Sequence, residues 1–438
     1  MAVPVSEYQA ALDALFARTA GQIKPGLGRT EALLLALGDP HQKIPCFHVA
    51  GTNGKGSVCA TIDALLRSRG LRVGRYTSPH LVNFRERIVI NGVAIPEEVV
   101  IAFLKDVERS ASVLGATFFE ITTALAFWYF AEQKVDVAVI ETGLGGEHDA
   151  TNVVTPIAAT VTNISLDHVE YLGPTLQDIA GEKGGIFKFG RPAIIGESRA
   201  DLAKILSARA EQRGATPIVQ VRTDWRSWSV SVTGAGTAFN ASTPTGEHRF
   251  VSPLLGEYQA RNTLTAFATV WTAGGKYRVE PKNANKALEQ VHLPGRFQRI
   301  GDWVFDVAHN AGGARALAES LATFPLRKPL TAVIGVLKDK DWQGILDALA
   351  PVVNRFIITQ PTTAPAGRAW DPMAAAMYAN KLKIPVDLDV KFEIALQRAQ
   401  ETIGTKLVTG SFHTVGDAMQ LLGIDPLTPG GTPRSNRS

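Results

Sequence analysis

Cysteine is scarce in this sequence, with only Cys46 and Cys59 among 438 residues. Two thiols are too few for the disulfide framework of a small secreted domain, and alone they do not make a zinc site. This scarcity excludes disulfide-rich and zinc-stabilised folds. We expect the protein to work in a reducing, cytoplasmic setting.

Long apolar runs and a strong charge of one sign are also missing. The segment from Met1 to Ala20 lacks a basic start followed by an apolar core, so we expect neither a signal peptide nor a membrane span. The formal net charge is only +4, and no dense stripe of Lys and Arg with interleaved aromatic residues occurs. We therefore expect no nucleic-acid or membrane partner, while small anionic substrates such as ATP are compatible with the charge.

The composition that is present is that of a globular protein, with 45% hydrophobic and 20% charged residues. A length of 438 residues is enough for two or three domains, each with its own core. The chain is therefore expected to fold as an ordinary soluble protein of more than one domain.

The stretch Gly51-Thr-Asn-Gly-Lys-Gly-Ser57 is the most informative in the chain. It follows the short apolar run 46–50 and precedes the helix-like run 58–68. A strand, a glycine-rich turn and a helix in this order gather backbone N–H groups and a helix N-terminus around one small concavity. The stretch predicts a phosphate-binding loop, and an ordinary glycine-rich turn is the plain alternative.

The residue types within this loop suit phosphate chemistry. Its glycines let the backbone approach anionic oxygens that a Cβ would obstruct. Lys55 supplies a positive charge, and Ser57 offers a hydroxyl to a phosphate-bound Mg²⁺. The spacing departs from the common G-x-x-x-x-G-K-[ST] pattern, because a glycine separates the lysine from the serine. The predicted nucleotide contacts of the loop are Gly51, Thr52, Asn53, Gly54, Lys55, Gly56 and Ser57.

Apolar strand patterns around this loop predict an open, mainly parallel sheet. Strands are expected at 46–50, 73–77, 136–140 and 156–163, and polar segments follow the last three at Thr77-Ser-Pro-His-Leu81, Glu141 with the loop 142–152, and Ser165-Leu-Asp-His168. The carboxyl ends of parallel strands meet at one edge, where ligands bind. Glu141 and His168 are therefore expected to converge on the phosphate loop, with the segment 82–91 as a long loop or ribbon over it.

Later patterns divide the chain into domains. Period-two alternation over 219–251 predicts a small antiparallel patch, and Leu293-Pro-Gly-Arg-Phe297 is the best candidate boundary. Beyond it, alternating strand and helix patterns predict a smaller doubly wound α/β domain without a phosphate loop of its own. We expect a P-loop-type α/β domain flanked by helices over 1–292, a C-terminal α/β domain over 297–425 and a flexible tail over 426–438.

Eight motifs occur in one order along the chain. They are Gly51-Thr-Asn-Gly-Lys-Gly-Ser57, Thr77-Ser-Pro-His-Leu81, Glu141-Thr-Gly-Leu-Gly-Gly146 with Asp149-Ala-Thr-Asn152, Asp167-His168, Glu182-Lys183, Leu293-Pro-Gly-Arg-Phe297, Asp306-Val-Ala-His-Asn310 and Gly410-Ser-Phe-His-Thr-Val-Gly416. Together they resemble the motifs of folylpolyglutamate synthases, which in their bacterial form are also dihydrofolate synthases and belong to the Mur ligase superfamily.

The resemblance implies an ATP-dependent amide ligase, an enzyme that forms a carbon–nitrogen bond. In this family the γ-phosphate of ATP passes to a carboxylate, and the amine of L-glutamate attacks the resulting acyl phosphate. The acid would be dihydropteroate, a reduced folate or both. Such chemistry needs positive charge at the transferring phosphoryl group, which Lys55, the loop amides and Mg²⁺ would supply. We expect a monomer whose partners are these small molecules.

The resemblance also implies metal ligands and catalytic residues. Lys183 matches a family lysine that can carry a carbamate, which would turn an ammonium into an oxygen ligand for a second Mg²⁺. The alternative is an ordinary surface lysine beside Glu182. A solvated loop carboxylate is the alternative for Glu141, and a histidine without a metal is the alternative for His168. The implied metal ligands are Ser57, Ser78, Glu141 and His168, and the implied catalytic residues are Lys55, Lys183 and His168.

Further matches concern the nucleotide. Asn262 matches the adenine contact, Arg296 the linker arginine that reaches the phosphates, Asp306 the ribose ligand, and His309 a further position near the nucleotide. They imply an ATP site clamped between two domains, which closure would assemble. The alternative for Arg296 is a linker residue paired with a nearby carboxylate.

The acid substrate has its own matching positions. Phe119, Glu120, Thr123 and Asp149 match residues that the family uses near the pterin, where an aromatic face and a carboxylate suit a flat, hydrogen-bonding heterocycle. Phe119 could equally be plain core. Two departures stand out, because Glu147-His148 follows Gly146 where the family usually has an arginine, and Ala311 replaces a common proline.

Two other functions compete with this interpretation. A muramyl peptide ligase would bring a separate N-terminal domain for its UDP-sugar, and the roughly 45 residues before the strand that leads into the phosphate loop are expected to be too few for one. A P-loop NTPase that acts as a switch or motor, or a nucleotide-binding module without ligase activity, is the alternative from another class.

Overall fold

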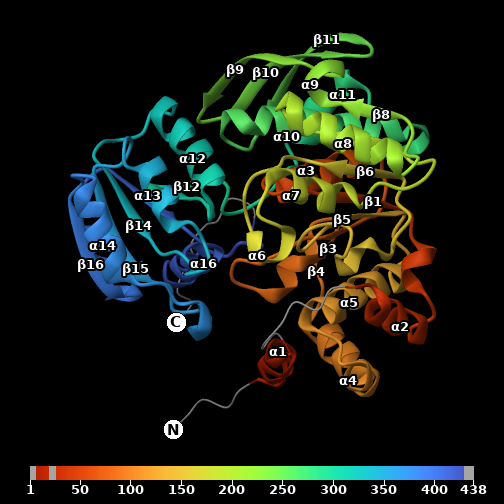
Figure 1. The fold of residues 1–438 in the computed structure, drawn as a ribbon, viewed down its shortest axis with the longest axis horizontal. Helices are drawn as coiled ribbons and strands as arrows, with labels where there is room; N and C mark the ends of the chain where they lie inside the picture. Colours follow the sequence, from red (N-terminus) through yellow and green to blue (C-terminus); the bar gives the residue numbers. More distant parts are fainter. Residues whose placement is uncertain (1–5, 19–25, 429–438) are drawn as a thin grey trace.

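The computed structural model describes residues 6–18 and 26–428, and Figure 1 shows two α/β bodies standing side by side. The larger body runs through α11 (Pro281–Leu288), and the smaller body, coloured from teal to blue, follows it. The tail expected over 426–438 lies outside the described residues from 429 onward, as do 1–5 and 19–25 of the N-terminal segment. No helix in the described stretches is long and apolar enough to cross a lipid bilayer.

An eight-stranded sheet forms the centre of the larger body, in the order β4-β3-β2-β5-β1-β6-β7-β8. The strands from β2 to β8 in this order run parallel, whereas β3 and β4 add an antiparallel edge. β1 and β5 lie in the middle because every residue of both strands is buried. The strands are β1 (Cys46–Ala50), β2 (Val73–Tyr76), β3 (Ile88–Ile90), β4 (Val93–Ala94), β5 (Val137–Glu141), β6 (Ala158–Val161), β7 (Ala193–Ile195) and β8 (Ile218–Gln220).

The segment 82–91 differs from the expected loop or ribbon over the site. Its middle forms the short 3-10 helix η2 (Phe84–Arg87), and the next three residues form β3, which pairs with β2. The reason is local, because Ile88, Val89 and Ile90 are all buried apolar residues with high strand preference. The expectation of a loop is therefore wrong for residues 88–90, which extend the sheet.

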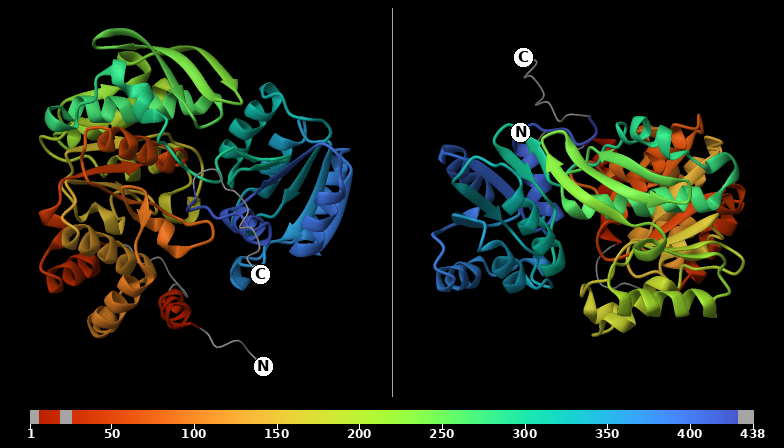
Figure 2. Two further views of the ribbon diagram at one scale, coloured as in Figure 1. Left: turned by 180° about the vertical axis from the view of Figure 1, so that it is seen from behind. Right: turned by 90° about the horizontal axis from the view of Figure 1, so that it is seen from above.

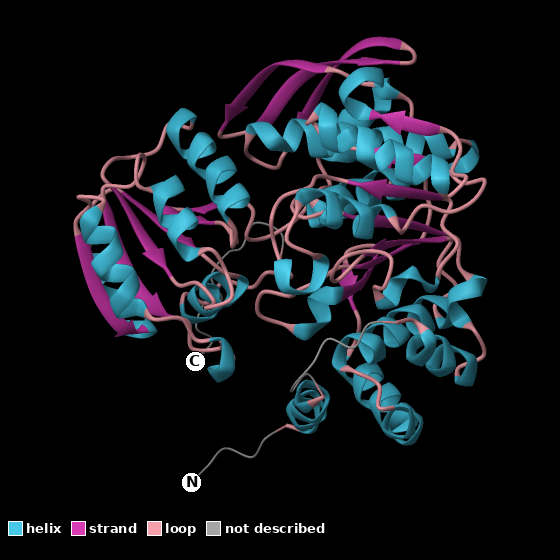
Figure 3. Cartoon of the chain, viewed as in Figure 1, coloured by secondary structure: helices cyan, strands magenta, loops and turns pink. Residues whose placement is uncertain are grey.

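Helices cover both faces of this sheet (Figure 3). α3 and α10 pack together on one face, while α2, α4 and α5 share a core on the other. α5 is buried as its apolar sequence predicts, because it lies between the sheet and its neighbouring helices. The helices are α1 (Glu7–Ala17), α2 (Gly28–Ala36), α3 (Lys55–Arg67), α4 (Glu97–Leu114), α5 (Phe118–Glu132), α6 (Val169–Leu172), α7 (Leu176–Gly184), α8 (Ala200–Gln212), α9 (Val221–Asp224) and α10 (Glu257–Ala273).

The expected antiparallel patch is a separate three-stranded sheet of β9 (Ser227–Thr233), β10 (Gly236–Thr243) and β11 (Gly246–Ser252). Its first predicted residue, Val219, belongs instead to β8 of the large sheet. Seen from above, the small sheet extends over the helices toward the second body (Figure 2). Val232 of β9 and the nearby Leu255 pack against that body's core, so the two bodies share an apolar contact.

The second body is built on a six-stranded sheet in the order β12-β13-β17-β14-β15-β16, parallel except for β12 at the edge. α12 and α13 share a core on one face, and α15 and α16 share a core on the other, which confirms the doubly wound prediction. The elements are β12 (Gln298–Ile300), β13 (Trp303–Phe305), α12 (Ala311–Thr323), β14 (Leu330–Ile334), α13 (Trp342–Leu349), β15 (Arg355–Gln360), α14 (Pro372–Lys381), β16 (Val386–Lys391), α15 (Phe392–Glu401), β17 (Thr405–Thr409) and α16 (Phe412–Leu421). Single 3-10 turns occur at η1 (Pro40–Lys43), η3 (Ala150–Val153), η4 (Gly275–Tyr277) and η5 (Ala366–Arg368).

Candidate active site

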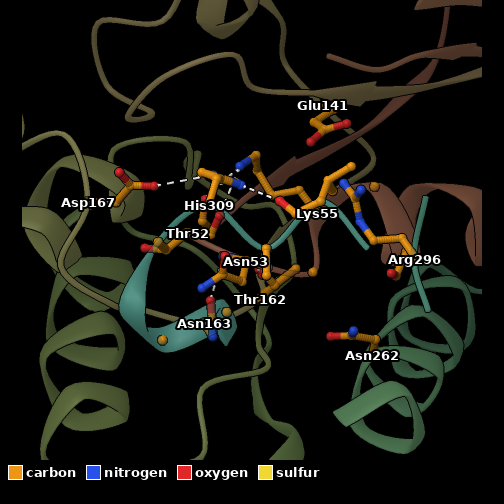
Figure 4. Close-up of a pocket in the computed structure, with 18 of the residues that line it drawn as sticks. Thr52, Asn53, Lys55, Glu141, Thr162, Asn163, Asp167, Asn262, Arg296 and His309 are labelled. Carbon is orange, nitrogen blue, oxygen red and sulfur yellow. Dashed lines mark hydrogen bonds and ion pairs between the residues drawn. The ribbon is translucent and has the colours of Figure 1, made fainter. Parts of the chain in front are cut away.

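One pocket collects the loops that follow strands of both sheets, and Figure 4 shows its interior. The larger body contributes the loops after β1, β2, β5 and β6, and the smaller body contributes the loop after β13. This is the carboxyl edge of each parallel sheet, where open α/β folds bind ligands. Of the predicted residues, the pocket is lined by Gly51, Thr52, Asn53, Gly54, Lys55, Gly56, Ser57, Ser78, Glu141, His168, Lys183, Asn262, Arg296, Asp306 and His309.

The predicted phosphate loop needs glycine at two positions. Gly51 has φ +148°, and a Cβ there would lie 1.9 Å from Thr162 Oγ1. Gly54 has φ +83°, and a Cβ there would lie 2.6 Å from Asn262 Oδ1. The loop is also fixed from β6, because the backbone N–H of Asn53 donates to Asn163 Oδ1 at 2.8 Å and Thr162 Oγ1 donates to Asn53 O at 2.7 Å. The loop is therefore a built concavity and not an ordinary turn.

The helix that follows the loop has a free N-terminus. Gly54 is the N-cap residue of α3 and has no side chain with which to bond the first helical N–H groups. Lys55 stands beside these groups, and its Nζ donates to the carbonyl oxygens of Gly51 at 3.1 Å and Thr52 at 3.2 Å. N–H groups and an ammonium at one point suit an anion such as a phosphate group.

Glu141 ends β5 inside the pocket wall, with 4% of its surface exposed. Its Oε2 accepts the backbone N–H of Ser78 at 3.3 Å, and it forms no ion pair with any residue that the structure describes. Burial raises the pKa of Glu141, while the charges of Lys55 and Arg296 and the Ser78 N–H oppose that rise. A buried carboxylate without a direct ion-pair partner, in the pocket that Ser57 and Ser78 also line, is a fitting donor for a divalent cation.

The described residues contain no ready-made cluster of three or more His, Cys, Asp or Glu side chains that could hold a metal. The predicted set is of a different kind, because it mixes the hydroxyls of Ser57 and Ser78 with Glu141 and His168. All four residues line the pocket. A cation there would need oxygens from a bound phosphate to complete its coordination, as Mg²⁺ in nucleotide sites commonly does.

Asp167 joins the two bodies. Its side chain is 8% exposed, and Lys340 from the second body places Nζ 2.5 Å from Oδ1. Asn310 Nδ2 donates to Asp167 Oδ2 at 3.1 Å, and His309 Nε2 lies 3.5 Å from the same oxygen. Burial alone would raise the pKa of Asp167, but the hydrogen bond and charges from His309 and Lys340 hold it well below its usual range. Asp167 is therefore a charged anchor between the domains.

His168 stands next to this anchor with a left-handed backbone, φ +52°. Burial, together with the positive charge of Lys340, lowers the pKa of His168 to about 4, against the opposing effect of Asp167. The imidazole is therefore neutral near pH 7, and its Nε2 lies 3.1 Å from Lys340 Nζ. A neutral imidazole is the form that coordinates metals.

Lys183 is almost fully buried, with 4% of its surface exposed, and it lines the pocket from α7. Burial, and after it the charge of Lys55, lowers the pKa of Lys183 to about 7. This lowered pKa makes the free amine accessible near neutral pH. The alternative of a surface lysine is therefore wrong.

Glu147 and His148, which depart from the family pattern, both have ionic partners nearby. Glu147 forms ion pairs with Arg209 and Arg213 of the neighbouring helix end, and it does not line the pocket. His148 Nδ1 lies 3.1 Å from Glu182 Oε2. The departure from the family pattern thus binds the loop to α7 and α8.

The nucleotide-side residues lie in the pocket with their own partners. Asp306 is buried, and its two oxygens accept the N–H groups of Phe297 and Ala308, both at 2.8 Å. It therefore also holds the linker that carries Arg296. The guanidinium of Arg296 lies 5.0 Å from the ring centre of Phe412 and has no carboxylate in ion-pair contact within the described chain, although the charges of Asp306 and Glu141 act on it. Asn262 Nδ2 donates to Gln259 Oε1 at 3.0 Å.

The four pterin-type residues do not line this pocket. They form a group behind the wall made by Gly143 and Leu144, where the tip of Phe119 touches Gly143 and Asp149 Oδ2 accepts the N–H of Leu144 at 2.8 Å. Tyr76 ties two of them together, because it stacks on Phe119 and shares a 3.2 Å hydrogen bond with Thr123. Glu120 is paired with Arg29 at 2.9 Å and also caps α5.

Three residues in or next to the pocket were not singled out from the sequence: Asn163 lines it, while Lys340 and Asn310 bond the pocket residue Asp167. Lys340 follows β14 in a Lys338-Asp-Lys-Asp341 run, and Asn163 follows β6. Asn310 bonds both Asp167 and Asn53. Polar residues close after a buried strand are the signal that identified Glu141, and the same signal could have identified Asn163 after β6.

Comparison with known proteins agrees with this geometry. The profile of the Mur ligase middle domain matches residues 49–270, and that of the Mur ligase glutamate ligase domain matches residues 295–412. A dihydrofolate synthase/folylpolyglutamate synthase of Escherichia coli is 34% identical over 98% of each chain. A folylpolyglutamate synthase of Mycobacterium tuberculosis solved with ADP has a TM-score of 0.88 at 33% identity, covering 96% of this chain and 99% of that one.

A bifunctional folylpolyglutamate synthase/dihydrofolate synthase solved with Mn, AMPPNP and L-glutamate has a TM-score of 0.81 at 30% identity, covering 96% of this chain and all of that one. Both domain profiles, the pocket between the domains and the full-length similarity to these enzymes lead to one assignment. The chain belongs to the Mur ligase family, in its folylpolyglutamate synthase/dihydrofolate synthase branch.

Proposed function

We propose that this protein is an ATP-dependent amide ligase that joins L-glutamate to dihydropteroate, to a reduced folate, or to both. The observation that carries the proposal is the single pocket in which the phosphate loop, the unpaired buried Glu141 and the neutral His168 face side chains of the second domain. Solved relatives with ADP, or with Mn, AMPPNP and L-glutamate, support the same ligands here.

The chemistry follows from charge. A carboxylate oxygen of the acid attacks the γ-phosphorus of ATP, the bond to the β-phosphate oxygen breaks, and ADP leaves. The amine of L-glutamate then attacks the acyl carbon, phosphate leaves, and the amine loses a proton as the amide forms. Both steps bring anions together, so Lys55 and the free N–H groups of the phosphate loop stabilise the charge on the phosphoryl oxygens.

The pocket residues fit a divalent cation. Ser57, Ser78, Glu141 and His168 would hold it, since Glu141 is buried without a direct ion-pair partner among the described residues and His168 is neutral. Mg²⁺ bound there would neutralise phosphate charge and orient the transferred group. Lys183, as a carbamate, would supply oxygens for a second ion. That modification needs CO₂ and the free amine, and burial gives Lys183 a pKa of about 7.

The remaining predicted residues divide between the two other ligands. We assign Asn262, Arg296, Asp306 and His309 to the nucleotide, because all four line the pocket. We assign Phe119, Glu120, Thr123 and Asp149 to the pterin end of the acid, because they cluster around Tyr76 and the loop 143–149. Because both domains of one chain line the pocket, we propose a monomer as the working unit, and its substrates are those of a cytoplasmic enzyme.

The domain division supports the same assignment. We propose that residues 1–292 hold ATP and the acid, while residues 297–425 add nucleotide contacts and receive L-glutamate. Lys340, His309 and Asn310 all reach across to Asp167, so both domains meet at the reacting groups.

A turnover screen tests the function. Purified protein is incubated with ATP, Mg²⁺ and L-glutamate, with either dihydropteroate or tetrahydrofolate as the acid, and the products are identified by mass spectrometry. The proposal expects ADP, phosphate and a product heavier by one glutamyl residue. ATP hydrolysis at the same rate without acid and glutamate would favour the P-loop NTPase alternative, and extension of tetrahydrofolate alone would restrict the activity to polyglutamylation.

A further inference from the structure

His48 places an imidazole inside β1, a strand in the middle of the large sheet whose residues are all buried. Side chains alternate along a strand, and Phe47 and Val49 pack in one core with α3 and α10. The side chain of His48 therefore points to the opposite face, where it meets η3. A buried polar side chain is costly unless it is hydrogen-bonded, so the partners of the two ring nitrogens decide what His48 does.

The first nitrogen, Nε2, lies 2.8 Å from Thr151 Oγ1. This hydroxyl has one proton, which it donates to Asp149 Oδ1, and the same oxygen accepts the backbone N–H of Thr151 at 3.0 Å. Thr151 Oγ1 therefore accepts from His48, which places the ring proton on Nε2. Burial, and after it the charge of Lys188, lowers the pKa of His48 to about 3, so the ring is neutral and has this one N–H.

The second nitrogen distinguishes His48 from a residue that only fills the core. Nδ1 is buried and has no hydrogen-bond partner among the residues that the structure describes. For packing alone, a leucine at this position would avoid the burial of an unpaired nitrogen. What the histidine adds to the fold is the Nε2–H group, and its single partner in the described chain is Thr151.

Asp149 continues the hydrogen bonds from His48 to the wall of the pocket. Its Oδ2 accepts the N–H of Leu144 at 2.8 Å, and Leu144 lines the pocket. Asp149 is 5% exposed and forms no ion pair within the described ranges, so hydrogen bonds compensate its buried charge. Burial raises the pKa of Asp149, and the Thr151 hydroxyl gives the largest opposing effect. The direction of the Thr151 O–H bond, which His48 determines, thus acts on Asp149.

We propose that His48 is a positioning residue, which fixes Asp149 through the Thr151 hydroxyl for binding of the flat heterocycle of the acid substrate. This inference rests on the proposed function, in which Asp149 belongs to the pterin end of the acid. His48 is fully buried, so it acts through Thr151 and not by touching the substrate. Its N–H occupies the acceptor side of the hydroxyl, and the hydroxyl proton then points to Asp149. The heterocycle meets a carboxylate of fixed orientation.

Binding of dihydropteroate and binding of ADP, each measured by calorimetry with Mg²⁺, test the inference with two variants. His48→Leu removes the N–H and keeps an apolar side chain of similar size. His48→Gln places an amide N–H at about the reach of Nε2. His48→Leu should weaken dihydropteroate binding on the order of tenfold and leave ADP binding at the parent value. His48→Gln should restore most of the lost affinity, which a role in packing alone does not explain.

A matched control and a double variant separate this effect from a general loosening of η3. Lys188 Nζ donates to Asn152 O at 3.0 Å, so Lys188→Met removes a bond to the same 3-10 turn outside the path from His48 to Asp149. It should keep the parent affinity for dihydropteroate. Thr151→Val interrupts the path and should weaken the acid at least as much as His48→Leu. In the Thr151→Val background, His48→Leu should cause no further loss, because the two changes remove one path.

NMR of ¹⁵N-histidine-labelled protein reads the ring proton without any substrate. The signals of His48, identified by their absence in His48→Gln, should be those of a neutral ring protonated at Nε2. A proton on Nδ1 would overturn the inference, as would parent-like dihydropteroate binding in folded His48→Leu or in Thr151→Val. Equal losses in His48→Leu and Lys188→Met would also overturn it.

Failure of the proposed function would look different. If the parent protein bound neither dihydropteroate nor tetrahydrofolate, the proposed function and the role of Asp149 in acid binding would both be refuted. An Nε2 proton in the spectrum of the same protein would then show that the hydrogen bonds from His48 to Asp149 exist and that the substrate assignment is what failed.

Discussion

Both sheets place the carboxyl ends of their parallel strands at the pocket, but the helices that begin there are capped differently. In the N-terminal domain, the N-cap residue of α3 is Gly54, which has no side chain to cap the helix. In the C-terminal domain, the N-cap residues of α12, α13 and α16 are Asn310, Asp341 and Ser411, and each of these side chains accepts an N–H of its own helix. The first edge leaves its helix N–H groups for a ligand, whereas the second uses them within the fold.

Under the proposed function, this difference means that one domain would bind phosphate with its backbone, whereas the other contributes side chains to the site. A backbone site requires glycines at fixed positions and a helix N-terminus, which Gly51 and Gly54 provide. The second domain instead sends Lys340 and His309 across to Asp167. Loss of the first site should remove chemistry, while loss of the second should weaken assembly of the site.

The largest effect is expected from Lys55→Ala. The substitution removes the positive charge beside the phosphate loop, so kcat/KM should fall on the order of 10² or more. Steady-state turnover measures this, with Lys338→Ala as a control because Lys338 is exposed in the other domain. A near-normal rate in Lys55→Ala would mean that the loop is not the phosphate site.

Glu141→Ala should follow, with a loss on the order of 10² at low Mg²⁺. The reason is that the only unpaired carboxylate among the predicted metal ligands disappears, while the fold keeps its buried strand. A titration of rate against Mg²⁺ should shift to higher concentrations. Curves that superimpose for the variant and the parent would remove Glu141 from the metal site.

Substitution of Lys183 should cause a smaller loss of activity, which an added small carboxylic acid should partly restore. Lys183→Ala should lower the rate about tenfold to hundredfold, and a small carboxylic acid should return part of it by replacing the carbamate oxygens. The pKa of about 7 sets the pH dependence, because the free amine forms the carbamate and its fraction falls as pH drops below 7. Stripping bicarbonate should therefore reduce activity more at pH 6.5 than at pH 8.5.

A structure of the protein with Mg²⁺ and nucleotide near neutral pH would show whether Lys183 carries a carbamate. Density that continues beyond Nζ toward the metals would support the carbamate. Density that ends at Nζ, with the side chain of Lys183 turned away from the metals, would contradict it.

The smallest effect is expected from Lys340→Gln in the second domain. This change breaks the 2.5 Å ion pair with Asp167 and should cost about tenfold in kcat/KM, since His309 and Asn310 still hold the anchor. Lys338→Gln is the control, because Lys338 lies in the same loop but is exposed. Equal rates for both variants would show that the bridge contributes nothing to the reaction.

Local patterns predicted most of the fold and the core of the site. The run 46–57 identified strand, loop and helix, because glycine spacing and apolar periodicity are properties of neighbouring residues. Glu141 and His168 were expected at the pocket since both follow buried strands, and both line it. The bridge between Lys340 and Asp167 was missed, because 173 residues separate its partners and no local pattern shows a contact between domains.

Some residues with predicted roles also have other partners in the structure, which the sequence could not show. The two carboxylate oxygens of Asp306 accept the backbone N–H groups of Phe297 and Ala308. Its proposed ribose contact therefore shares the carboxylate with the linker. Glu120 is already paired with Arg29. Glu147, which departs from the family pattern, is paired with Arg209 of α8 and with Arg213 at the end of that helix, and it does not line the pocket. Side-chain pairing across distant helices decides such cases.

The central claim is that the acid carboxylate itself attacks ATP in the pocket between the two edges. Dihydropteroate labelled with ¹⁸O in its carboxylate, turned over with ATP, Mg²⁺ and L-glutamate, tests this most directly by mass spectrometry of the released phosphate. We predict ADP as the nucleotide product and one ¹⁸O atom in each phosphate, because the acyl phosphate breaks at the acyl carbon. Unlabelled phosphate, or AMP that carries the label, would contradict the account.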